Sequence, residues 1–277
     1  MKQHYTVITP GSSWFNIDIK ELFQYKDLFW TLAIRDFKVR YAQTFLGFFW
    51  ALIQPLATLL IFTVVFGKAV RVDTGNIPYP LFAACGMTAW TYFAFVLAQS
   101  GNSIIAAQGM VRKIYFPRII VPLSKAIVGF IDFGIALLIL IVIMLIYGVF
   151  PSGNIFWLPI FIILNILTAL GAGIWLSALT IRYRDFIHII PFMVQFGLYA
   201  TPVAYPTHVL FGNLPEWALI LFYLNPMAGV VEGYRWSILG TGAPELYMFI
   251  SFTVAILLFF SSLVYFGRVQ DKIADLV

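Results

Sequence analysis

The sequence predicts an all-α membrane protein with six transmembrane helices, an N-terminal amphipathic interfacial helix and a re-entrant helical hairpin between spans five and six. Two observations predict this fold class. Of the 277 residues, 61% are hydrophobic and only 10% are charged, whereas soluble domains average about 45–50% apolar and about 25% charged residues. The apolar residues also form runs of the length that a bilayer-crossing helix requires, about 20 residues. This composition argues against a soluble globular enzyme, a disordered chain and a secreted disulfide scaffold.

The apolar runs define six expected spans. The turn signal at residues 151–154 separates the third run from the fourth, and Pro202 ends the fifth. The third run contains Asp132, which is the one acid within a span. The expected spans are residues 45–66, 81–98, 119–147, 155–181, 186–200 and 246–267.

The segment between spans five and six, residues 201–245, carries several prolines around a short apolar stretch at 217–224. Eight apolar residues are too few to cross a bilayer, yet the segment is too apolar for a solvated loop. We therefore expect a re-entrant pair of half-helices. An extended outer loop resting on the membrane surface is the alternative.

Basic residues are distributed unequally between the two sides of the membrane. With the N-terminus inside, 14 of the 17 Lys and Arg residues fall on the inner side, and Lys68, Arg71 and Arg235 remain outside. Because cytoplasmic loops are enriched in Lys and Arg, both termini are expected in the cytoplasm. The net charge of +5 therefore reflects topology and gives no reason to expect a nucleic-acid partner. We divide the chain into a cytoplasmic segment, residues 1–43, and one transmembrane domain, residues 44–277.

Residues 19–41 are expected to form an amphipathic helix lying in the headgroup plane. Lys26 and Arg40 intrude on its apolar arc, where their stems are expected to snorkel. A helix packed on a soluble partner is the alternative. The expected apolar face consists of Leu22, Phe23, Phe29, Trp30, Ala33, Ile34, Phe37 and Tyr41.

The chain lacks the motifs of a nucleotide site or a hydrolase, since GxxxxGK[ST], GxSxG and HExxH are all missing. Cys85 is the single cysteine, and the three histidines are far apart without metal-ligand spacing. We therefore expect no catalytic residue, no metal and no cofactor on this chain. Asp132 lies only about two helical turns from Lys125, which favours a structural hydrogen-bonding role over proton-coupled transport.

The loop at residues 109–118 is short, basic and aromatic. Pro117 discourages helix at Phe116 and forces a turn before span three. This favours a rigid turn just below the membrane, shaped to dock on a partner. An ordinary positively charged inner loop is the alternative.

Aromatic residues make up 18% of the chain. Some belong to the membrane interfaces, and others carry polar tips into the middle of spans, where they need hydrogen-bond partners. A channel wall of such rings would let sugars slide without holding any one tightly. Core packing is the alternative for each residue. The candidate lining residues are Trp50, Trp90, Tyr92, Phe196 and Tyr199.

Taken in order, these segments resemble the permease subunits of polysaccharide-exporting ABC transporters, the O-antigen, capsule and teichoic-acid export group. The resemblance covers nearly the whole chain. It rests on the aromatic amphipathic helix with IRDFKVRY at 34–41, LGFFWALIQP at 46–55, KIYFPR at 113–118, IRYRD at 181–185, and NPM at 225–227 with Glu232 and Arg235.

The resemblance implies a transport subunit of the bacterial cytoplasmic (inner) membrane. A second copy of the chain would complete a channel, and two separate subunits would bind ATP and Mg²⁺. The cargo would be a glycan on a polyprenyl pyrophosphate lipid. The implied functional residues are Arg112, Lys113, Tyr115, Phe116, Pro117 and Arg118 for coupling to the ATPase, Phe29, Trp30, Arg35, Lys38 and Arg40 for an interfacial gate helix, and Asn225, Pro226, Glu232 and Arg235 for the outer re-entrant region.

Three alternatives remain open. Within the same superfamily, the chain would be a permease for teichoic acid, a small lipid or a drug, although the aromatic spans favour a glycan. A membrane-embedded glycolipid-modifying enzyme is disfavoured because no acid pair or metal-ligand set lies near a membrane face. A secondary transporter is disfavoured because that class commonly shows internal repeats, and the sequence shows none.

Overall fold

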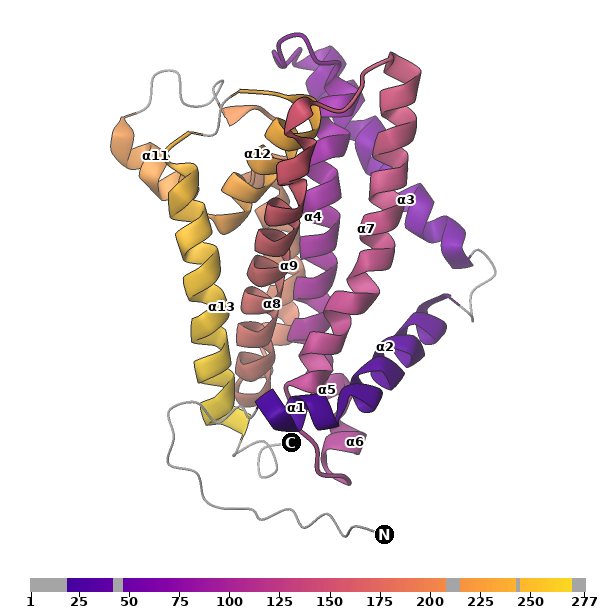
Figure 1. Ribbon diagram of the computed structural model, residues 1–277, viewed down its shortest axis with the longest axis vertical. Helices are drawn as coiled ribbons and strands as arrows, with labels where there is room; N and C mark the ends of the chain where they lie inside the picture. Colours follow the sequence, from indigo (N-terminus) through magenta and orange to yellow (C-terminus); the bar gives the residue numbers. More distant parts are fainter. Residues whose placement is uncertain (1–18, 42–46, 208–214, 243–244, 271–277) are drawn as a thin grey trace.

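The computed structural model describes residues 19–41, 47–207, 215–242 and 245–270, and all regular structure in these ranges is helical. Four long helices run side by side along the molecule (Figure 1). Helix α4 packs against both α7 and α8, and α13 packs against α8. The four helices are α4 (Tyr79–Gly101), α7 (Ile120–Tyr147), α8 (Leu158–Arg182) and α13 (Met248–Gln270). The expected all-α class is confirmed for the described residues.

Five helices in the described ranges are long and apolar enough to cross a membrane. Four are those named above, with α8 extended at its start by the 3₁₀ turn η2 (Gly153–Trp157). The fifth consists of α3 (Gly47–Phe62) and the π-helical turn η1 (Thr63–Ala69). Each corresponds to one expected span, although residues 45 and 46 of the first span lie outside the described residues.

The remaining expected span differs from the others in length. Helix α9 (Phe186–Ala200) has the expected bounds, but its 15 residues extend only about 22 Å at 1.5 Å per residue. The hydrocarbon core of a bilayer is about 30 Å thick. The helix stops because Thr201 adopts an extended conformation and Pro202 follows it. The chain then continues without a long helix to Thr207.

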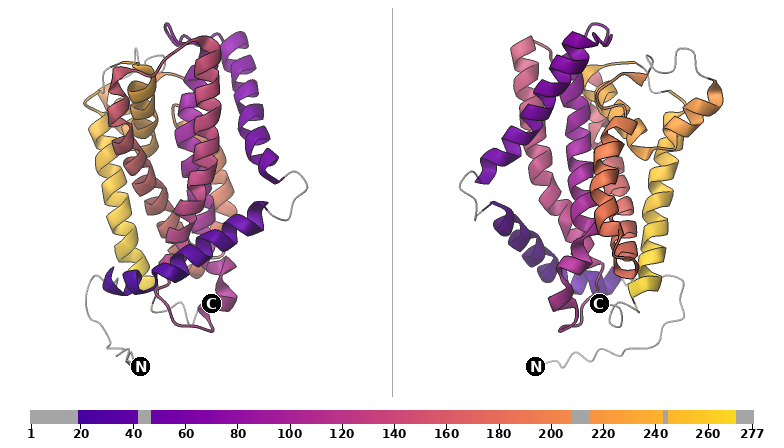
Figure 2. Two further views of the ribbon diagram at one scale, coloured as in Figure 1. Left: turned by 45° about the vertical axis from the view of Figure 1, so that its right-hand side comes forward. Right: turned by 180° about the vertical axis from the view of Figure 1, so that it is seen from behind.

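Short helices lie at both ends of the bundle. At the lower end in Figure 1 are α1 (Ile19–Gln24), α5 (Ser103–Ala106) and α6 (Gln108–Val111), and α2 (Lys26–Tyr41) slants across the lower part of α7 (Figure 2). At the upper end are α11 (Glu216–Tyr223) and α12 (Pro226–Leu239).

Helix α12 is largely buried and packs on α4, α8 and α13. Its bounds follow from local chemistry. The Asn225 side chain accepts a hydrogen bond of 3.0 Å from the Met227 amide, and Pro226 occupies the first helical position, where proline is favoured. Gly240 ends the helix at φ +71°, a conformation that glycine adopts without strain. Helices α11 and α12 therefore meet at a turn centred on Asn225.

The outward face of α3 is unusually apolar. Phe49, Leu60 and Ile61 are all exposed, and little of this helix is buried within the chain. Patches of this kind are rare on soluble monomers. In a membrane such a face contacts lipid or another transmembrane helix.

Gly171 allows α8 and α13 to approach each other closely. A Cβ atom at Gly171 would lie 2.9 Å from the backbone nitrogen of Phe259 on α13, so even alanine requires one helix to shift. We expect Gly171→Ala to destabilise the bundle by about 1–3 kcal/mol, measured as a lower thermal unfolding midpoint in detergent. Gly134→Ala on α7 is the matched control, because a Cβ there meets no atom within 4 Å. Equal midpoints for the two variants would contradict this packing.

Candidate functional site

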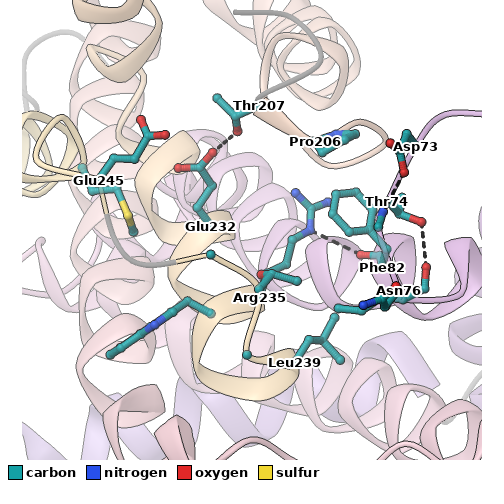
Figure 3. A pocket seen from close by; sticks show the side chains of 17 residues that line it. Asp73, Thr74, Asn76, Phe82, Pro206, Thr207, Glu232, Arg235, Leu239 and Glu245 are labelled. Atoms are coloured by element: carbon teal, nitrogen blue, oxygen red, sulfur yellow. Dashed lines mark hydrogen bonds between the residues drawn. The ribbon is translucent and has the colours of Figure 1, made fainter. Parts of the chain in front are cut away.

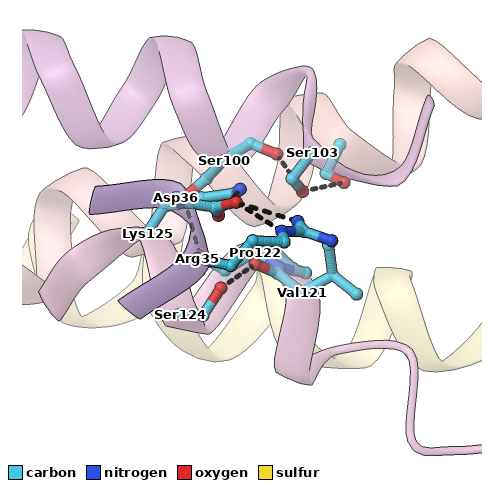
Figure 4. A network of polar contacts seen from close by, with 9 residues as sticks. Arg35, Asp36, Ser100, Ser103, Val121, Pro122, Ser124 and Lys125 are labelled. Carbon is cyan, nitrogen blue, oxygen red and sulfur yellow. Dashed lines mark hydrogen bonds and ion pairs between the residues drawn. The ribbon is translucent and has the colours of Figure 1, made fainter. Parts of the chain in front are cut away.

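Two ion pairs hold α2 on α7 at the lower end of the bundle. The Arg40 guanidinium lies 2.6 Å from one carboxylate oxygen of Asp132, and the Tyr41 hydroxyl donates to the other oxygen at 2.9 Å. One turn earlier on α2, Asp36 pairs with Lys125 of α7 (Figure 4). We call these four charged residues, Asp36, Arg40, Lys125 and Asp132, the α2 latch.

The latch is well shielded on the α7 side. The side chains of Asp132 and Lys125 are only 7% and 10% exposed, and the Arg40 guanidinium also lies 4.4 Å from the centre of the Phe95 ring. Charges held within a membrane protein require partners, because leaving either partner alone and dehydrated is costly. The structure therefore gives Asp132 a partner in the chain itself.

The structure shows which residues of α2 pack on the bundle, a point that the expected apolar face leaves open. Leu32, which the expected apolar face omits, is buried together with Ala33 against the bundle, and Arg40 points to Asp132 instead of snorkelling. The apolar side chains on the opposite side of α2 are left exposed, because in a membrane lipid rather than protein surrounds them. The exposed apolar stripe consists of Trp30, Ile34 and Phe37 on α2, together with Phe23 on α1.

The predicted gate residues therefore differ in their burial and in their contacts. Phe29 packs against the core, whereas Trp30 beside it is exposed, and their rings meet edge to face at 5.7 Å. Arg35 forms an exposed pair with Asp36 at 2.8 Å. Lys38 is exposed, and Arg40 belongs to the latch. Arg35 and Lys38 are thus the exposed basic side chains among the predicted gate residues that lie outside the latch.

The loop at 112–118 projects from the lower end and is fixed at its base. Phe116 is buried, and Arg118 donates to the backbone carbonyl of Gln270 at the end of α13. Tyr115 at the tip is 59% exposed, next to exposed Ile114. Partial burial, and then the carboxylate of Glu21 on α1, raise the pKa of the Tyr115 hydroxyl.

The remaining loop residues divide in the same way between tip and base. Arg112 and Lys113 are exposed at the tip, whereas Pro117 is half-buried at the base. The geometry is that of a fixed turn presenting an aromatic tip with basic neighbours.

A pocket of about 510 Å³ opens at the upper end, between the start of α4, the segment after α9, and α12 (Figure 3). Arg235 of α12 lies at its base and is only 3% exposed. Its guanidinium donates to the carbonyl oxygens of Val203 at 2.6 Å and Pro202 at 2.5 Å, and it lies 3.6 Å from the centre of the Phe82 ring. Arg235 thus satisfies backbone carbonyls where the chain leaves helix α9.

Burial lowers the pKa of Arg235 to about 10, which leaves it charged at neutral pH. Gly86 of α4 makes room for the guanidinium, since a Cβ there would lie 2.7 Å from its Nη2 atom. Glu232 accepts a 2.6 Å hydrogen bond from the Tyr223 hydroxyl and another from Thr207. Burial raises the pKa of Glu232 to about 7, against the opposing effects of Tyr223 and Arg235.

The four outer residues singled out in the sequence lie along α12 and its turn. Asn225 caps the helix and also donates to the Thr201 hydroxyl at 2.9 Å, which ties the turn to the end of α9. Pro226 begins the helix. Glu232 and Arg235 line the pocket.

The candidate lining aromatics separate into buried and exposed groups. Tyr92 is 1% exposed and Trp90 is also buried, so both pack inside a single chain. Trp90 fills the space beside Gly197 of α9, where a Cβ would lie 2.7 Å from its ring. The three that lie on the surface of the chain are Trp50, Phe196 and Tyr199.

Sequence reasoning missed the role of Asp36, Tyr41 and Lys125 in holding α2. A usable signal is present in the spacing. Asp36 and Arg40 are four residues apart, and Lys125 and Asp132 are seven apart, so each pair lies on one helical face. The order of charges is acid then base on α2, and base then acid on α7, which makes the two faces complementary.

These features define a multi-span helical membrane protein with a fixed turn at one end and a polar pocket at the other. The sequence pattern of the ABC-2 type transporter family matches residues 27–239, and the chain belongs to this family. In it the membrane chain is a transport subunit of the bacterial inner membrane, and ATP hydrolysis resides on a separate subunit.

The chain is similar to permeases named for polysaccharide export. It is 26% identical to the O-antigen export system permease protein RfbA of Klebsiella pneumoniae over 252 residues, which cover 91% of this chain and 95% of that one. It is 26% identical to RfbA of Myxococcus xanthus, covering 78% and 82%. It is 22% identical to the polysialic acid transport protein KpsM of Escherichia coli, covering 75% and 80%.

Proposed function

We propose that this chain is the permease subunit of an ATP-driven exporter that moves a lipid-linked polysaccharide from the inner to the outer face of the cytoplasmic membrane. The similarity to an O-antigen export permease along 91% of the chain is the observation that carries this proposal. Two copies of the chain form the channel, and two ATP-binding subunits dock at the lower end. That end faces the cytoplasm, because it carries the basic loop at 112–118 and Arg182 and Arg184.

Helix α9 and the segment at 201–207 together make the sixth crossing. The helix begins at the lower end, just after α8 ends, and the chain reaches the upper pocket at Pro206 and Thr207. Backbone that is not helical is tolerated at membrane depth only where its polar groups are satisfied by the protein, and Arg235 supplies two of those hydrogen bonds. Helices α11 and α12 form the re-entrant hairpin beside this segment.

The α2 latch sits where a lipid-linked anion would meet the permease. The lipid tail of this substrate stays in the bilayer against the exposed apolar stripe of α1 and α2. The pyrophosphate of the substrate reaches the basic side chains of Arg35 and Lys38. Phosphate groups are favoured beside arginine and lysine. The glycan then passes along a seam between two copies, where Trp50, Phe196 and Tyr199 lie on the surface of each chain.

The loop at 112–118 transmits ATP-driven closure to the bundle. We expect Tyr115→Ala to weaken binding of the ATP-binding subunit about tenfold or more, because exposed tyrosines are frequent hot spots of interfaces. The measurement is the Kd of the ATP-binding subunit for the permease in nanodiscs, together with export in cells. Phe156→Ala at the upper end is the control, since Phe156 is also an exposed aromatic residue. Unchanged affinity and export in Tyr115→Ala would contradict the coupling role.

Arg118 requires a separate interpretation. Because it holds the end of α13 through the Gln270 carbonyl, its replacement perturbs the base of the loop as well as its surface. Tyr115 is therefore the cleaner test of docking.

A further inference from the structure

The pocket at the upper end has the size and shape of a small-molecule site. Its volume of about 510 Å³ falls within the range of about 300–1,000 Å³ that is usual for ligand pockets. It is formed within one chain, and its walls come from the loop before α4, the segment after α9, and α12 (Figure 3). The transport path that we propose does not require it, because that path runs between two copies.

The groups that the pocket offers to a ligand are mainly hydrogen-bond acceptors. Asp73, Glu232 and Glu245 line it from three different segments. Each carboxylate oxygen of Glu232 already accepts one hydrogen bond within the chain, from Thr207 or Tyr223, and retains one further lone pair for a ligand. Among the described residues that line it, Arg235 is the one cation, and its guanidinium is occupied by the carbonyls of Pro202 and Val203. The pocket is therefore acidic, and it favours ligands rich in hydroxyl donors over anions, which would meet like charges.

An aromatic surface completes this lining. Trp236 is half-buried in the pocket wall, with its ring 6.4 Å from that of Trp157 and 6.2 Å from that of Phe161. These neighbours limit the movement of the indole. A pocket lined by a fixed apolar ring and by several carboxylates is suited to a molecule with an apolar C–H face and a hydroxylated rim, which is the chemistry of a pyranose.

We propose that this pocket binds a neutral sugar residue of the glycan as it leaves the membrane domain, and that it disfavours acidic sugars. This inference rests on the proposed export function, because that function supplies the sugar. It adds a preference that the family alone does not give. A neutral glycan would pass the pocket with transient contacts, whereas a polymer of acidic sugars would be repelled by the carboxylates of Asp73 and Glu245 and by Glu232 in its ionised form.

The test is saturation-transfer NMR on the full-length chain in nanodiscs of neutral lipid. The probes are three neutral trisaccharides, built from glucose, galactose and mannose, and trigalacturonic acid as the acidic counterpart. We expect at least one neutral trisaccharide to bind measurably and trigalacturonic acid to bind at least about tenfold more weakly. Glu245→Lys should reduce this discrimination about tenfold or more, because it exchanges an acceptor for a cation at the pocket.

Glu216→Lys is the matched control. Glu216 is an exposed acid at the start of α11 and does not line the pocket, so this variant should bind as the unaltered chain does. Failure of all neutral probes to bind would overturn the proposal, as would equal binding of the acidic probe. Surface display of the glycan in cells, measured in parallel, tests the export function separately, because display does not depend on detecting binding at the pocket.

Discussion

Arg40→Asp is expected to release α2 from α7 and to stop export. The substitution places two carboxylates together, where Arg40 now lies 2.6 Å from Asp132. Breaking a buried pair costs about 3–5 kcal/mol, and we expect about 3 kcal/mol here because the Arg40 side chain is 38% exposed. Such a change raises the population of detached α2 about a hundredfold, measured as faster amide hydrogen exchange in residues 26–41.

The reversed pair provides the decisive comparison. Arg40→Asp combined with Asp132→Arg restores opposite charges, so exchange in α2 should slow again and part of the export should return. Arg35→Ala is the control for the exchange measurement, since its exposed pair with Asp36 contributes at most about 1 kcal/mol. If the amide hydrogens of α2 exchange as fast in the double variant as in Arg40→Asp, the two residues do not act as a pair. That result would contradict the role of the α2 latch.

Arg235→Met is expected to have the largest effect at the opposite end of the bundle. The substitution keeps most of the side-chain length but leaves the carbonyl oxygens of Pro202 and Val203 without their donors, and it leaves Glu232 beside an apolar group. Each unsatisfied buried polar group costs about 1–3 kcal/mol. We therefore expect a loss of about 3–5 kcal/mol, seen as low yield of folded chain and a large fall in unfolding temperature.

Two further variants make this result specific. Arg235→Lys retains the charge but cannot reproduce the forked contacts of the guanidinium, so its stability should fall between those of Arg235→Met and the unaltered chain. Lys68→Met removes an exposed basic residue near the same end and should leave the unfolding temperature nearly unchanged. A stable Arg235→Met protein would show that the segment after α9 does not depend on Arg235.

The long helices were predictable because their signal is simple. The runs at 81–98, 119–147, 155–181 and 246–267 predicted α4, α7, α8 and α13 within a few residues, since a bilayer requires continuous apolar length and little else. The bounds of α9 were also predicted, since Pro202 marks the end of the run at 186–200. Hydropathy does not show how the non-helical segment after α9 is held, because the Arg235 side chain that binds its carbonyl oxygens is distant in the sequence.

The site was less accessible to sequence reasoning, for two physical reasons. A helical wheel of residues 19–41 separates apolar from charged positions, but in a membrane the apolar side faces lipid as readily as protein. The wheel therefore does not show which residues of α2 pack on the bundle, and the partners of Asp132 could be found only by comparing charge spacing on two helices. Arg235 was counted among the charges on the outer side, and the structure shows that its side chain is buried. A count of charges in loops does not reveal which groups contact them.

The most direct test of the central claim measures where the glycan is. In the native host, deletion of this chain should leave the lipid-linked glycan synthesised but inaccessible to a membrane-impermeant lectin added to spheroplasts. The unaltered chain should restore lectin binding, and Arg40→Asp should not. Undiminished lectin binding in cells that lack the chain would contradict its role as the exporting permease.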